Sequence, residues 1–323
     1  MANARPSYLS LHDSGELLHR AGILRRMLGN CKLCPHECGV DRLVGERGFC
    51  RAPGYVEYAS ASAHGGEEPV LSGTRGSGTI FFTYCNSRCM FCQNFDISQL
   101  EHGREISEDG IADLYLALQQ RGCHNVNFVT PAHYIPQIVG ALEIAADRGF
   151  HLPLVYNSNG YDSVPVLRLL DGIIDIYLPD MKYGNDEAAR RLSSLPNYVE
   201  HNRAAIAEMY RQVGLLETDE RCIALKGLII RHLVLPNGLS GTSEVLKSIA
   251  EIDPSINISL MGQYYPAYRA GENQQLNRRL LQREYREAIE TMERHGLVNG
   301  WTQQLHLLDD TYKPDFPGEK WKL

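Results

Sequence analysis

Apolar residues along this chain form short continuous runs that alternate with segments of helical spacing. Runs typical of strands occupy residues 79–83, 126–129, 152–155, 173–178, 228–235 and 257–261. Between them, recurrence every three or four residues predicts helices over 107–118, 134–146, 164–170, 185–213, 244–252 and 283–295. Strands that are nearly all apolar and alternate with helices indicate an α/β fold with a parallel sheet covered by helices.

Six such units are fewer than the eight of a closed barrel, which typically needs about 250 residues. The pattern therefore predicts a partial, open (β/α)6 TIM-like barrel. An amphipathic helix over 11–30 and a cysteine-rich segment over 31–53 precede it. We divide the chain into an N-terminal helix and cysteine-rich metal-binding segment (1–70), the barrel (71–300) and a C-terminal tail (301–323).

Composition narrows the class of protein. Of the 323 residues, 43% are hydrophobic and 22% are charged, which is ordinary for a globular protein. The net charge of −7 argues against nucleic-acid binding. No apolar run is long enough for a membrane span, and residues 1–26 lack the apolar core of a signal peptide. We expect a cytoplasmic protein, in which nine clustered cysteines favour metal or cluster ligation over disulfides.

Three of these cysteines, Cys85, Cys89 and Cys92, follow the first strand of the predicted barrel at C-x3-C-x2-C spacing. Three thiolates can bind three irons of a [4Fe–4S] cubane and leave the fourth iron open to a chelating molecule. Active sites of such barrels lie at the C-terminal ends of the strands, where this loop is expected. The alternative is a zinc site that takes a fourth ligand, such as a histidine, from elsewhere.

The spacing, with Phe91 directly before the last cysteine, resembles the radical S-adenosylmethionine (SAM) superfamily. The chain is most similar to the branch of pyruvate formate-lyase activating enzyme, and to a subgroup with extra N-terminal cysteines. The resemblance implies that SAM binds the open iron and that the reduced cluster cleaves it to methionine and a 5′-deoxyadenosyl radical. It also implies an electron donor such as flavodoxin or ferredoxin.

The resemblance further implies SAM and substrate contacts at the ends of successive strands. Many members have Gly-Gly-Glu after the second strand, where this chain has Thr130 and His133 as the available polar groups. Purely structural roles are the alternative for the other candidate residues, because Asn-Gly pairs form turns, Asp caps helices and a buried Arg forms ion pairs. The candidates for cofactor binding are Thr130, His133, Asn157, Asn159, Asp180, Arg231 and Gln263, and those for catalysis are Arg231, Lys182 and Asp180.

A second set of cysteines, Cys31, Cys34, Cys38 and Cys50, lies in the N-terminal segment. Four thiolates in a compact loop suit tetrahedral zinc or an auxiliary iron–sulfur cluster equally well by count. Cys123 and Cys222 precede the second and fifth strands. We expect them at the N-terminal ends of the strands as ordinary buried or surface residues, and the alternative is that one of them donates a hydrogen atom to a radical.

Three functions remain open from sequence. The first is an activating enzyme that takes a hydrogen atom from a glycine of a partner protein. The second is a radical epimerase or rearrangement enzyme acting on a small molecule or carbohydrate. The third is a non-catalytic iron–sulfur or zinc protein.

Overall fold

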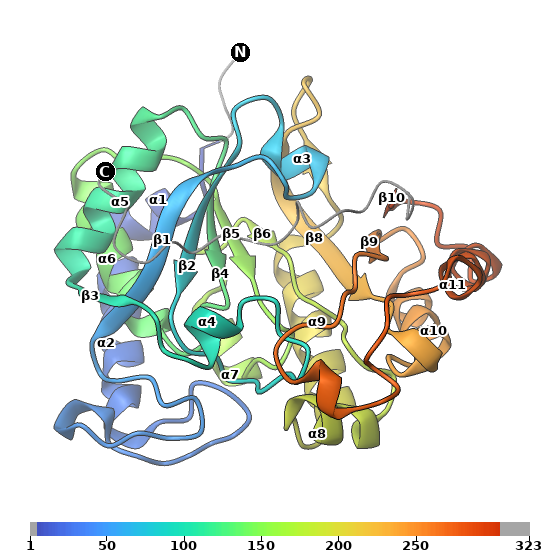
Figure 1. Ribbon diagram of the computed structural model, residues 1–323. Coiled ribbons are helices and arrows are strands. Elements are labelled where there is room, and N and C mark those ends of the chain that lie inside the picture. Colours follow the sequence, from blue (N-terminus) through green and yellow to red (C-terminus); the bar gives the residue numbers. More distant parts are fainter. Residues whose placement is uncertain (1–4, 304–323) are drawn as a thin grey trace.

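The computed structural model describes residues 5–303, and its centre is a mixed, mainly parallel sheet (Figure 1). The strands β2, β4, β5, β6, β8 and β9 are parallel and adjacent in this order. Their bounds are Ser77–Phe82, Val126–Val129, Leu154–Asn157, Ile176–Tyr177, Ala224–Leu233 and Asn257–Met261. The predicted parallel α/β core is thereby confirmed, and it is consistent with a partial radical SAM barrel.

Further strands extend this sheet at both edges. On one side β1 (Val56–His64) runs antiparallel to β2, and β3 (Arg104–Ile106) runs antiparallel to β1. On the other side β10 (Gly300–Thr302) continues parallel to β9, and β7 (Glu217–Thr218) pairs with β8. These four strands were not predicted, since three of them are only two or three residues long and β1 is rich in Ser and Ala.

Helices connect and cover the parallel strands. They are α5 (Glu108–Gln120), α6 (Ile135–Asp147), α7 (Val164–Leu169), α8 (Asp186–Ser193), α9 (Tyr198–Val213), α10 (Thr242–Ile252) and α11 (Gln282–Arg294). Alternate strand residues such as Val126 and Phe128 pack in the same core as α5 and α6. As predicted, Ser107 caps α5, because its Oγ accepts a hydrogen bond from the Gly110 amide at 3.1 Å.

Two predicted helices are interrupted in the structure. The helix expected over 11–30 is three pieces, α1 (Tyr8–Asp13), α2 (Glu16–Arg26) and a 3-10 turn (Met27–Asn30). Gly15, at φ +74°, separates α1 from α2. The stretch 185–213 divides into α8 and α9. Ser194 and Asn197 adopt left-handed conformations around Pro196, which cannot continue a helix.

The two ends of the barrel are built differently. At the N-terminal ends of the parallel strands, α3 (Pro69–Ser72) places Val70 and Leu71 against the inward residues Val155, Ile176 and Ile229. The loop after β2 and the short helix α4 (Phe95–Ser98) lie at the opposite end (Figure 1). Among residues 5–303, no helix is both long and apolar enough to span a membrane.

Two of the predicted segments contain strands of the main sheet. Strand β1 lies within the predicted N-terminal segment 1–70 but pairs with the main sheet. Residues 301–303 of the predicted tail include the end of β10, and the rest of that tail lies outside the described residues.

Candidate functional site

The loop that follows β2 carries Cys85, Cys89 and Cys92. Burial raises the pKa of the Cys85 thiol well above its ordinary value, and the neighbouring Cys89 and Cys92 raise it further. Burial and Cys89 likewise raise the pKa of Cys92 to about 11. Such thiols become thiolates when a cationic metal centre takes the place of their protons. The donor set therefore fits an iron–sulfur cluster.

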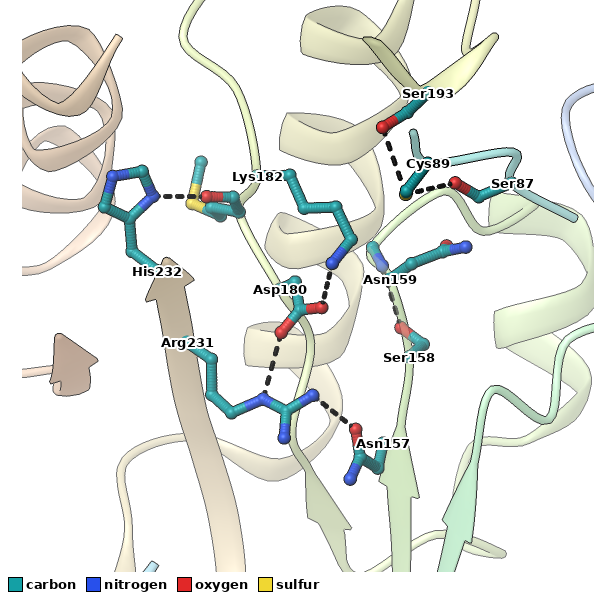
Figure 2. Close-up of polar contacts among 12 residues, drawn as sticks. Ser87, Cys89, Asn157, Ser158, Asn159, Asp180, Lys182, Ser193, Arg231 and His232 are labelled. Atoms are coloured by element: carbon teal, nitrogen blue, oxygen red, sulfur yellow. Dashed lines mark hydrogen bonds and ion pairs between the residues drawn. The ribbon is translucent and has the colours of Figure 1, made fainter. Parts of the chain in front are cut away.

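Each of these three sulfurs has a polar neighbour. Ser87 Oγ and Ser193 Oγ lie 2.9 and 3.0 Å from Cys89 Sγ, on two sides of it (Figure 2). Ser98 Oγ lies 3.2 Å from Cys92 Sγ, and Asn159 Nδ2 lies 3.6 Å from Cys85 Sγ. Hydroxyl and amide donors around cysteine sulfurs are the environment that stabilises cluster thiolates.

Three cysteine thiolates match the ligand set of a cluster that keeps one iron open. Ligands of one zinc must converge on a point, whereas cubane ligands bind three different irons.

A charged group lies where β6 and β8 end. Arg231 Nε donates to Asp180 Oδ1 at 2.9 Å, and Lys182 Nζ donates to Asp180 Oδ2 at 2.5 Å, so the carboxylate stands between the two cations (Figure 2). Arg231 Nη2 also donates to Asn157 Oδ1 at 2.6 Å. The strand pairing continues past β6 through a bridge between Asp180 and Arg231, which fixes these side chains next to one another.

The charges in this group hold one another ionised. Burial alone would raise the pKa of Asp180, but the cations of Arg231 and Lys182 outweigh it and hold that pKa below its ordinary value. The pKa of Lys182 is raised because Asp180 and Cys89 outweigh the effect of burial. Lys182 in turn lowers the pKa values of Cys85 and Cys92. The charged group therefore lies close enough to the three cysteines for their charges to interact.

Sequence reasoning missed two acids of this site, Glu67 and Glu68. Glu67 Oε2 lies 3.8 Å from Arg231 Nη1. Burial, together with the charge of Glu68, raises the pKa of Glu67 to about 7 against the lowering effect of Arg231. Glu68 Oε2 is buried and has no hydrogen-bond partner among the described residues. The available signal was a pair of adjacent acids in a Gly-Gly loop directly before Pro69.

Helix α9 also supports the site, although no motif in the sequence indicated this role. The Tyr198 hydroxyl accepts a hydrogen bond from the Lys182 amide at 2.9 Å and lies 3.1 Å from the carbonyls of Asn159 and Asp180. Asn202 Nδ2 donates to the carbonyls of Gly160 and Asp180, each at 3.0 Å. These contacts fasten the ends of β5 and β6 to one another.

The remaining site residues predicted from sequence lie in two different parts of the fold. Asn159 Nδ2 reaches Asn86 Oδ1 in the cysteine loop at 2.8 Å, and the Thr130 amide donates to the Asn157 carbonyl at 2.8 Å. Gln263 borders the same loop, because its carbonyl accepts from Gln93 Nε2 at 3.5 Å. These residues lie around the cysteine loop and the charged group.

His133 lies in the second place, next to the N-terminal cysteines. Its Nε2 lies 2.8 Å from the Thr83 carbonyl, and it lines a small cavity together with Cys31, Cys34, Cys38 and Cys50. Burial lowers the pKa of His133 to about 3, so the ring is neutral. These contacts place His133 between the N-terminal segment and the start of the cysteine loop.

The N-terminal cysteines face one another across that cavity. The amide of Phe49 donates to Cys38 Sγ at 3.2 Å, and Gly48 is required because a Cβ there would lie 2.7 Å from the same sulfur. Arg42 is buried and donates to the His133 carbonyl at 2.7 Å, which joins the segment to the barrel. His36 extends the contact to the cysteine loop, with its Nε2 2.9 Å from the Asn86 carbonyl.

Cys123 and Cys222 lie away from both cysteine groups in the fold. Cys123 is buried just before β4, and Cys222 is exposed just before β8. Both therefore lie at N-terminal ends of strands, as expected from sequence.

Comparison with known proteins identifies a family domain in the central part of the chain. The model of the radical SAM superfamily matches residues 79–218. An uncharacterised protein of Methanocaldococcus jannaschii is 36% identical over 282 residues, covering 85% of this chain and 78% of that protein. A solved structure of TYW1 with a lysine–pyruvate adduct bound aligns with a TM-score of 0.42 at 13% identity, covering 67% of this chain and 73% of that one. Residues 79–218 therefore form a domain of the radical SAM superfamily, whose members use a [4Fe–4S] cluster and SAM.

Proposed function

We propose that this protein is an activating-enzyme-like radical SAM enzyme, in which Cys85, Cys89 and Cys92 hold the cluster and the charged group beside them binds SAM and substrate. The observation that carries the proposal is the charged group Asp180–Arg231–Lys182, whose Lys182 acts electrostatically on the buried cysteines. When bound, the cluster and SAM supply a carbon-centred radical able to take a hydrogen atom from a substrate. Their reduction requires an electron donor, for which we propose a small protein such as flavodoxin or ferredoxin.

The charged residues have distinct roles in this proposal. Lys182 and Arg231 bind a carboxylate of SAM or of an acidic substrate, because both present charged N–H donors. Asp180 orients both cations, since one of its oxygens bonds to each. Thr130, Asn157, Asn159 and Gln263 supply neutral polar contacts around the cofactor.

Metal analysis of oxygen-free protein tests the cluster assignment. Replacing Cys85, Cys89 and Cys92 by alanine is expected to remove about four irons per chain and to abolish formation of 5′-deoxyadenosine. The matched control replaces Cys123 and Cys222, and it should keep both properties. Retention of all iron in the triple variant would contradict the assignment.

Isotope transfer tests the proposed target, a glycine of a partner protein. An extract from cells grown with deuterated glycine is incubated with the reduced enzyme and SAM. We expect deuterium in 5′-deoxyadenosine and a glycyl radical signal by electron paramagnetic resonance. If 5′-deoxyadenosine forms without deuterium and without this signal, the target is not a glycine, and the radical epimerase or rearrangement enzyme takes its place.

We further propose that Cys31, Cys34, Cys38 and Cys50 hold a second metal, either zinc or an auxiliary iron–sulfur cluster. Their shared cavity and the amide hydrogen bond to Cys38 Sγ support this site. A Cys34→Ala variant is expected to lose this metal while the catalytic cluster stays bound. Zinc loss identifies a structural site, iron and sulfide loss identifies a second cluster, and an unchanged metal content contradicts the proposal.

A further inference from the structure

The end of α8 lies directly on the cysteine loop, although more than a hundred residues separate the two in sequence. The carbonyls of Leu192 and Ser193 accept hydrogen bonds from the amides of Met90 and Arg88 at 2.8 and 2.9 Å. The last carbonyls of a helix have no partner inside the helix. Here the cysteine loop supplies partners, so the loop on both sides of Cys89 is held at fixed positions.

The side chain of Ser193 completes this contact. Its Oγ lies 3.0 Å from Cys89 Sγ, and both residues are buried. A serine in a helix commonly bonds to the carbonyl four residues earlier, which for Ser193 is that of Ala189. Ser193 instead points to the sulfur, as Figure 2 shows.

Proton counting sets the direction of the hydrogen bonds. Ser193 Oγ also lies 2.5 Å from the Tyr183 hydroxyl, which is buried as well. A metal-bound thiolate can only accept hydrogen bonds, so Ser193 must donate its one hydroxyl proton to Cys89. Tyr183 is then the donor to Ser193, and the result is a chain from Tyr183 through Ser193 to Cys89. Hydrogen bonds in such a chain strengthen one another.

The three cysteines differ in the polar groups that lie beside their sulfurs. Cys89 has two hydroxyl neighbours, Ser87 and Ser193, and one of them belongs to a distant helix. Cys92 has one hydroxyl neighbour, and Cys85 has an amide at 3.6 Å. A donor withdraws electron density from a cluster sulfur and so favours the reduced cluster.

We propose that Ser193, oriented by Tyr183, is a positioning residue that donates to the Cys89 thiolate and raises the reduction potential of the cluster. The inference rests on the proposed function in one respect, that Cys89 is a cluster ligand. It assigns to α8 a task that no motif in the sequence marks.

The test compares midpoint potentials by redox titration with electron paramagnetic resonance, on protein with its cluster reconstituted. Ser193→Ala is expected to keep its iron and to shift the midpoint to a more negative value. The shift should correspond to several-fold and at most about tenfold in the reduction equilibrium, or about 59 mV for one electron. Tyr183→Phe should shift it in the same direction by less.

The matched control is Ser77→Ala. Ser77 is a fully buried serine whose Oγ donates to Asn125 Oδ1 at 2.6 Å, at the end of β2 remote from the cysteine loop. Its variant should leave the midpoint unchanged.

An unchanged midpoint in Ser193→Ala with full iron content would overturn the inference. If Ser193→Ala does not hold iron, Tyr183→Phe decides, because it removes only a hydroxyl outside the loop, and an unchanged midpoint there has the same meaning. Failure of the wild type itself to bind a cluster refutes the proposed function instead, so the two failures are distinguishable.

Discussion

At the scale of single residues, the site depends on charges that are buried together. Arg231 is surrounded by Asp180, Glu67 and the Asn157 amide oxygen. Each of these partners is deprived of water, so the guanidinium replaces the hydration that they have lost. Residues of this kind affect both stability and ligand binding.

Replacing Arg231 by methionine is expected to lower the free energy of unfolding by roughly 3–5 kcal/mol, because it removes the cation that the buried carboxylates of Asp180 and Glu67 share. SAM cleavage should also be lost. Denaturant unfolding under nitrogen measures the first effect. Arg148→Met is the control, since Arg148 forms its ion pairs with the exposed carboxylates of Asp109 and Asp113 and should change stability much less. Equal effects of the two substitutions would contradict the assigned role.

His232 makes stability depend on pH. Burial lowers its pKa from 6.5 to about 4. Its Nδ1 lies 2.6 Å from the Met181 carbonyl and must donate, so Nε2 accepts from Thr242 Oγ1 at 3.0 Å. Between pH 6.5 and 4 the unfolded chain binds more protons than the folded one, so stability falls as pH falls through this window.

The measurement compares wild type with His232→Asn, which keeps a donor but does not titrate. Wild type should lose on the order of 2–3 kcal/mol more than the variant between pH 7 and pH 4.5. Parallel profiles would show that His232 is not the titrating group.

At the scale of elements, strand ends and tight turns place the site residues. Gly160 follows β5 at φ +73°, and a Cβ there would lie 2.1 Å from the Asp180 carbonyl oxygen and 2.2 Å from Asn202 Nδ2. The turn after β5 and the end of β6 therefore approach one another at a distance that excludes every residue but glycine.

Gly160→Ala is expected to displace Asp180 and to reduce SAM cleavage more than tenfold, together with a clear loss of stability. Gly149→Ala is the matched control. Gly149 also has positive φ, at +88°, but a Cβ there meets nothing within 4 Å, so only the conformational cost of about 1 kcal/mol applies. Activity and melting temperature measured on both variants check the prediction, which fails if the two behave alike.

The elements differ in how well the sequence predicts them. The helix α5 and the strand β4 are predicted almost to the residue, because Ser107 caps the one and a continuous apolar run forms the other. Strand β1 has no such signal, since its Ser and Ala residues are half-buried and its partner β2 supplies the hydrogen bonds. Strand β6 is shorter than its apolar run, because Ile173 and Ile174 are buried by tertiary packing outside the sheet.

At the scale of the whole molecule, cofactor binding links the cysteine loop to the fold. We expect SAM at about 100 times its dissociation constant to stabilise the cluster-containing wild type by about 2.7 kcal/mol. The variant without Cys85, Cys89 and Cys92 should gain much less, because the open iron supplies part of the binding. Melting temperatures with and without SAM measure this, and an equal gain in both proteins would show that SAM binds independently of the cluster.

The sequence by itself determined the cofactor chemistry and the parallel core. Spacing of Cys85, Cys89 and Cys92 and the apolar runs are local properties, and local properties can be read along the chain. The tertiary structure alone decided that Glu67 lies against Arg231, that His133 faces the N-terminal cysteines and that Ser193 reaches Cys89. These partners come from distant elements, and only packing of the barrel brings them within hydrogen-bonding or electrostatic reach.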